Sequence, residues 1–166
     1  MTSKSAWSAL AAVTITAVSL TASSDTPNTV HIPRAGVKLD PPAGWSKVAA
    51  GDWTRFKPSD EFARLGFVVF DKPHEATARI GEIASQFELS NMSWGGAQDT
   101  TVGQFPAHSA QASSCTLKNG DPCFLWYATV NPGTPEQILV VYLVNLAKGE
   151  KHKAAVKASV QSLRKG

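Results

Sequence analysis

The sequence lacks the short motifs that mark the common families of catalytic sites. It contains no glycine-rich phosphate-binding loop, no G-x-S-x-G nucleophile motif and no H-E-x-x-H zinc motif. Its aspartates and glutamates mostly stand beside Gly, Pro or Ser, which is typical of turns and helix caps rather than of an acid–base pair. We therefore predict no catalytic residue and expect that the protein is not an enzyme.

The sequence shows as little sign of a metal or cofactor site. None of its four histidines has another ligand two, three or four positions later, the spacing expected within a zinc site; they are His31, His74, His108 and His152. Only the fold can bring ligands that are distant in sequence together. We expect no metal ion and no cofactor.

Internal repeats and low-complexity segments are absent, and 166 residues are enough for one domain with a substantial core but not for two. A long hydrophobic run is missing as well. The apolar stretch over residues 6–20 is too short, and too diluted by Ser and Thr, to make a good membrane span. No cysteine comes directly after it, so we expect no lipid attachment there.

The N-terminus has the features of a cleavable signal peptide. Lys4 precedes the apolar stretch, and Ala22 and Ser24 place small residues where a signal peptidase would cut, leaving Asp25 as the new N-terminus. The alternative is an N-terminal helix that belongs to the fold. We predict a signal peptide over residues 1–24, a polar linker over 25–33 and a single domain over 34–166, exported to the periplasm or beyond the cell.

Three consecutive segments in the second half predict an antiparallel core. The third of them, from Ile138 to Val144, is apolar without alternation, which favours a strand covered on both faces. Turns rich in Gly, Asn and Pro separate the segments, which span residues 107–117, 123–130 and 137–146.

The only two cysteines lie on either side of the first of these turns. A three-residue loop at 118–120 pairs Leu117 with Asp121 and places Cys115 opposite Cys123. In an exported chain this arrangement predicts a structural disulfide. The alternative is a reactive thiol assisted by His108, but no constellation that would hold a thiolate is visible.

Two helices and several further strands complete the predicted fold. Helical spacing of apolar residues indicates helices over 73–89 and 150–164, and strands are expected over 36–40, 45–49, 53–57 and 64–71, with weaker candidates over 92–96 and 100–105. Turns rather than repeated helical crossovers join the strands, so the sheet should be mainly antiparallel. We predict an α/β (α+β) three-layer sandwich with helices on both faces of the central sheet.

The final helix concentrates the positive charge of the chain. Six basic residues against Glu150 alone follow residue 147, and they suggest a surface around Lys153 and Lys157 for a polyanion, a membrane or an acidic partner. The alternative is a solvated helix face, with Arg164 and Lys165 at the helix C-terminus. Since no aromatic residue is interleaved with these charges, we expect no nucleic-acid binding.

Four tryptophans in the predicted domain are many for its size. Trp45 and Trp126 are expected in the core, whereas Trp94 is the best candidate for exposure because Gly95 and Gly96 follow it. An exposed tryptophan suits an interface anchor. Trp94 and Gly95 are therefore candidate binding residues, although packing against the fold would also explain Trp94.

Several segments of the sequence resemble PsbP-like domains. The P-A-G-W stretch at 42–45 looks like the entry motif of that superfamily, and G-Q-F-P-A-H at 103–108, the Cys115 hairpin and the segments 127–133, 137–142 and 162–164 are also similar. The resemblance covers about residues 30–164. The superfamily includes extrinsic subunits of the oxygen-evolving complex, a Ran-binding nuclear import factor, bacterial envelope proteins and secretion chaperones. The resemblance implies a non-catalytic domain that binds other proteins.

Taken together, the sequence predicts an exported, monomeric, non-catalytic domain that binds an unidentified protein partner and has no stable membrane span after signal removal. One alternative is a small-ligand carrier of the cell envelope, which would need an aromatic-lined pocket of at least about 300 Å³. The other is a hydrolase, which would need His108 or His74 within hydrogen-bond reach of a carboxylate and a nucleophile.

Overall fold

The computed structural model describes residues 28–166. The predicted signal peptide over residues 1–24 lies outside the described residues and stays a prediction. No helix within residues 28–166 has the length and apolarity needed to cross a membrane.

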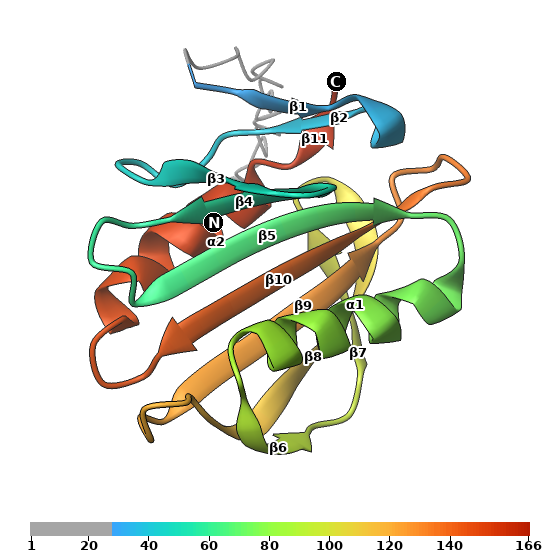
Figure 1. The fold of residues 1–166 in the computed structure, drawn as a ribbon. Coiled ribbons are helices and arrows are strands. Elements are labelled where there is room, and N and C mark those ends of the chain that lie inside the picture. The colour runs from blue at the N-terminus through green and yellow to red at the C-terminus, as the bar shows by residue number, and fades with distance from the viewer. Residues whose placement is uncertain (1–27) are drawn as a thin grey trace, which may run out of the picture.

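An eight-stranded sheet forms the centre of the domain (Figure 1). Its strand order is β3-β4-β5-β10-β9-β8-β6, and β7 also pairs with β8. Every pairing in it is antiparallel, as predicted. The strands are β3 (Ser46–Ala50), β4 (Trp53–Lys57), β5 (Ala63–Phe70), β6 (Ser90–Trp94), β7 (Gln98–Val102), β8 (Phe105–Thr116), β9 (Cys123–Val130) and β10 (Gln137–Asn145).

The central strand β10 is buried on both faces, which confirms the interpretation of its apolar sequence. Ile138, Val140, Tyr142 and Val144 belong to one core cluster, and Leu139, Val141 and Leu143 belong to the other. Because successive side chains of a strand point to opposite faces, β10 alone supplies residues to both cores.

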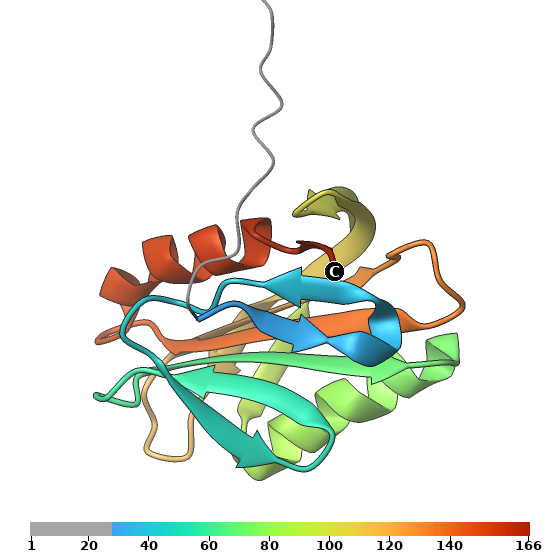
Figure 2. The same ribbon diagram turned by 90° about the horizontal axis from the view of Figure 1, so that it is seen from above.

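One helix lies on each face of the sheet (Figure 2). Helix α1 (Pro73–Gln86) buries Ala76, Ile80 and Ile83 in the core cluster that contains Leu139. Helix α2 (Lys153–Gln161), preceded by the short 3-10 helix η2 (Glu150–His152), buries Val156 and Val160 in the other cluster. This arrangement confirms the three-layer sandwich.

A second, three-stranded sheet departs from the prediction at both ends of the domain. It has the order β1-β2-β11, with β1 (Val30–Ile32), β2 (Val37–Leu39) and β11 (Arg164–Lys165), and η1 (Pro33–Ala35) joins β1 to β2. Strand β1 falls within 25–33, where we predicted a linker, because its three residues pair with β2. Strand β11 removes Arg164 from the helix predicted over 150–164, because its residues pair with β2 instead.

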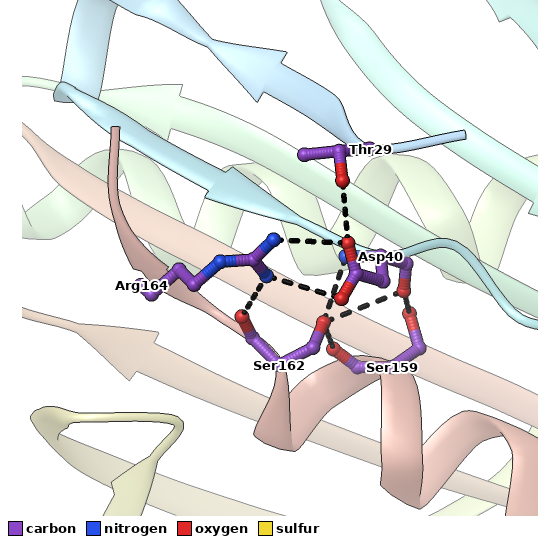
Figure 3. Close-up of polar contacts among 5 residues, drawn as sticks. All are labelled: Thr29, Asp40, Ser159, Ser162 and Arg164. Atoms are coloured by element: carbon purple, nitrogen blue, oxygen red, sulfur yellow. Dashed lines mark hydrogen bonds and ion pairs between the residues drawn. The ribbon is translucent and has the colours of Figure 1, made fainter. Parts of the chain in front are cut away.

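A polar network fastens this small sheet to α2 (Figure 3). Asp40, directly after β2, accepts bonds on both carboxylate oxygens from the Arg164 guanidinium at 3.1 and 3.2 Å. Ser159 Oγ donates to the Asp40 carbonyl at 2.6 Å, and the Asp40 amide donates to Ser162 Oγ at 2.8 Å. Thr29 Oγ1 completes the network on Asp40 Oδ1 at 2.7 Å. Paired carboxylate–guanidinium bonds are strong and directional, so they help to fix the C-terminal strand β11 beside β2.

The cysteines form the predicted disulfide. Cys115 on β8 and Cys123 on β9 are bonded, with their Cα atoms 5.1 Å apart. The Leu117 amide donates to the Asp121 carbonyl at 2.9 Å, as the predicted three-residue loop requires. The disulfide links β8 to β9 close to their connecting turn, and it lies on the face of the sheet that α1 covers.

The turn between β7 and β8 has room only for glycine. Gly103 adopts a φ of +58°, and a Cβ atom there would overlap the carbonyl group of Leu163. The neighbouring Gln104 amide donates to that carbonyl at 3.2 Å. The backbone of the β7–β8 turn therefore packs directly on the backbone of Leu163, just after α2.

We predict that Gly103→Ala destabilises the domain by at least about 2 kcal/mol, because left-handed strain and a backbone clash add together. Thermal and urea unfolding would measure the loss. The matched control is Gly51→Ala, since Gly51 has a φ of +63° but open space where a Cβ would be. Equal losses in the two variants would contradict the clash.

Candidate functional site

Trp94 is exposed at the end of β6, as its sequence context predicted. It is one of two large hydrophobic residues of the described chain that are exposed, with 39% of its surface accessible, the other being Leu146. Its ring meets Tyr127 edge to face, with the ring centres 5.4 Å apart. Trp94 lies opposite Ala112 of β8 in the register of the sheet. The side chain is therefore oriented by a neighbouring aromatic ring yet open to solvent.

Gly95 leads the chain from β6 to β7 along the outer edge of β8. Its amide donates to the Gln111 carbonyl at 2.9 Å, and residues 95–97 are exposed. A shallow pocket of about 160 Å³ lies here, lined in part by Gly95, Gly96 and Trp126. Trp126 is only partly buried, and so is Trp45, so both tryptophans expected in the core lie at its boundary.

His108 and Asp99 form an exposed pair on the same edge. His108 Nδ1 lies 2.5 Å from Asp99 Oδ1, and the side chains are 73% and 88% accessible. The pair meets one requirement of the hydrolase alternative, a histidine within reach of a carboxylate. Among residues 28–166, no hydroxyl or thiol is hydrogen-bonded to the other ring nitrogen of His108.

Lys153 and Lys157 lie on α2, across the sheet from Trp94. Trp94 shares a face with Tyr127 and α1, while α2 covers the opposite face. The two predicted surfaces are therefore separate. Most of the positive charge counted in the sequence is also balanced by acids: the pairs are Lys148–Asp121, Lys151–Asp60, Lys153–Glu150 and Arg164–Asp40.

A polar cluster at the start of α2 had no signal in the sequence, because it joins Asp60 and His152, which are 92 residues apart. Asp60 lies 2.9 Å from His152 Nε2 and 2.7 Å from Lys151 Nζ. The Trp45 ring packs edge to face on His152, with centres 5.5 Å apart. The pKa of Asp60 is held well below its usual range, and the hydrogen bond from Lys151 contributes most to this lowering. We interpret this cluster as the anchor of α2.

The described pockets give no support to the small-ligand carrier. The two larger ones have volumes of about 240 and 260 Å³. Both fall below the lower bound of about 300 Å³ for ligand pockets. Within residues 28–166 there is also no group of three or more His, Cys, Asp or Glu residues that could hold a metal ion.

We predict that Asp60→Asn lowers stability at pH 7 and flattens the acid dependence. The folded-state pKa of Asp60 lies below its unfolded value of about 3.9, so its contribution is complete above that value and is lost as the pH falls further. Melting temperatures at pH 7 and pH 3 would measure this. The control is Asp99→Asn, another histidine-paired carboxylate but a nearly fully accessible one. Identical pH profiles for the parent and Asp60→Asn would contradict the anchor.

Comparisons with known proteins identify relatives in structure only. No protein-family model matches the chain. No curated protein matches it either. Similarity to solved structures is clear at low sequence identity. The solution structure of cyanobacterial PsbP (CyanoP) from Synechocystis sp. PCC 6803 matches with a TM-score of 0.56 at 8% identity, covering 83% of this chain and 91% of CyanoP.

Two further structures share the architecture. LpqN of Mycobacterium tuberculosis, which is involved in cell envelope biogenesis, matches with a TM-score of 0.51 at 15% identity, over 81% of this chain and 87% of LpqN. A Bacteroides thetaiotaomicron VPI-5482 protein matches with a TM-score of 0.54 at 11% identity over 79% of this chain, which spans only 45% of that protein. The order of strands and helices and these similarities agree: the chain has the PsbP-like fold that its sequence motifs predicted.

Proposed function

We propose that this protein is an exported, monomeric, non-catalytic domain that binds a protein partner through the surface around Trp94 and Gly95. The observation that carries the proposal is the exposed Trp94 ring, oriented by Tyr127 at an edge of the sheet. Tryptophan is among the residues that contribute most to protein interfaces, and a ring already held in place loses little conformational freedom on binding.

Export to the periplasm or the cell exterior rests on two features of the chain. Residues 1–24 have the pattern of a signal peptide. The Cys115–Cys123 disulfide is of a kind that persists in oxidising compartments and is rare in the cytosol. The shared fold with LpqN, a protein involved in cell envelope biogenesis, agrees with such a location.

Lys153 and Lys157 take a lesser part in this proposal. Lys153 lies 3.2 Å from Glu150, and both side chains are largely exposed. Exposed ion pairs contribute little, and a partner gains little from a cation that already has an anion beside it. Lys157 can still steer an acidic partner over a distance, an effect that salt would screen.

We predict that Trp94→Ala weakens capture of the partner at least tenfold while changing the melting temperature by less than about 2 °C. The experiment is a cross-linked pull-down with the chain from residue 25 onward, mixed with envelope and secreted fractions of its own source and read by mass spectrometry.

The matched control is Leu146→Ala, which removes the other exposed large hydrophobic side chain. It should retain the partner, and Lys157→Ala should weaken capture less than threefold. A protein captured equally by the parent and Trp94→Ala would contradict the proposed surface. A melting temperature lowered by several degrees would show that Trp94 serves the fold.

A further inference from the structure

The backbone of β7 points half of its hydrogen-bonding groups away from the sheet. Thr101 lies opposite Pro106, which has no N–H, and the Pro106 carbonyl accepts the Asn131 amide at 3.0 Å on its other side. Thr101 and Pro106 are therefore a non-hydrogen-bonded pair. Because the two kinds of pair alternate, Asp99 opposite His108 is another. The N–H and C=O groups of Asp99 and Thr101 thus face outward.

No other strand of the described residues covers this edge. Strand β7 pairs with β8 alone, in an unbroken register of five residue pairs, and Asp99, Thr100 and Thr101 are exposed. Its neighbour β6 pairs with the same side of β8 but with two register shifts. Of the two, β7 is the regular strand, and a regular open edge can accept another strand.

The sequence of this edge lacks the usual protection against strand pairing. Proteins commonly place lysine or proline on open edges, and β3 at the opposite edge of the sheet carries Lys47. From Ser90 to Thr116 the sequence has no Lys, Arg or Glu, and Asp99 is its only carboxylate. The edge thus combines exposed backbone groups with a single carboxylate, Asp99. The neighbour of this carboxylate is His108 and not a Lys or Arg.

Trp94 lies in line with β7. Strands β6 and β7 follow one another along β8. Trp94 of β6 lies opposite Ala112, and Asp99 of β7 lies opposite His108. Those positions are four residue steps apart along β8, which is roughly 13 Å of strand. An extended segment of five or six residues is long enough to pair with β7 and reach the Trp94 ring.

We propose that β7 binds an extended segment of the partner protein as an added strand, with a Lys or Arg of that segment beside Asp99 and an apolar side chain on the Trp94–Tyr127 pair. This inference rests on the proposed function and names its mode of recognition. Main-chain hydrogen bonds to Asp99 and Thr101 supply affinity, and the two side-chain contacts supply selectivity.

The test uses a random dodecapeptide library displayed on phage, selected against the purified protein, and the Thr101→Pro variant. Proline at Thr101 removes only an outward N–H, so we expect the β7–β8 bonds and the fold to be retained. The matched control is Ala49→Pro on β3. Ala49 lies opposite Thr54, next to the Ala50–Trp53 pair that closes the Gly51–Asp52 turn, so its N–H also faces outward.

The expected result is a set of peptides that combine a basic residue with alternating apolar residues. Synthetic versions should bind at least tenfold more weakly to Thr101→Pro and to Asp99→Lys, and equally well to Ala49→Pro. Hydrogen exchange at the amides of Asp99 and Thr101 in the parent protein should slow when a peptide binds. That measurement keeps the inference testable if Thr101→Pro does not fold.

Three outcomes would overturn the inference. One is a selection that yields no binding peptide. Another is a peptide that binds Thr101→Pro as well as the parent; if capture of the natural partner still depends on Trp94, the proposed function survives and only strand addition fails. The third is a parent protein that is dimeric by light scattering and becomes monomeric on Thr101→Pro, which would make a second copy the occupant of the edge.

Discussion

Burial of β10 on both faces is the constraint on which the rest of the structure depends. A strand whose side chains are apolar in both directions needs a cover on each side, since apolar surface left in water costs about 25 cal/mol per Å². Helix α1 covers one face, and α2 with the small sheet covers the other. Strands β5 and β9 pair with β10 on its two sides and bring their own apolar residues to both cores.

Besides the apolar contacts of Val156 and Val160, polar contacts with residues distant in sequence hold α2 in place. The Asp60 cluster fixes its start, and the Asp40–Arg164 network fixes its end to the small sheet. The Leu163 carbonyl then meets the β7–β8 turn at Gly103. These contacts use much of the positive charge of the C-terminal segment. The candidate binding surface lies elsewhere, at a sheet edge that carries few charges and an exposed tryptophan.

Much of the fold was predictable because it depends on local pattern. The unbroken apolar run of β10, the turn residues between β8, β9 and β10, and the helical spacing in α1 each report burial directly. The disulfide followed from the same hairpin register. The prediction missed the short strands at 30–32 and 164–165. Segments of two or three residues have too little pattern of their own, and they become strands only because β2 pairs with both.

By itself, the sequence determined the three-layer architecture, the cysteine pairing and the exposure of Trp94, since each depends on residues close along the chain. Only the tertiary structure decided which charges remain unbalanced, which faces the candidate residues share and which strand edge stays open. Those properties depend on pairs such as Asp60 with His152, or Asp40 with Arg164, which folding brings together from 92 and 124 residues apart. Local pattern carries no information on such pairs, because their contact depends on how the layers stack.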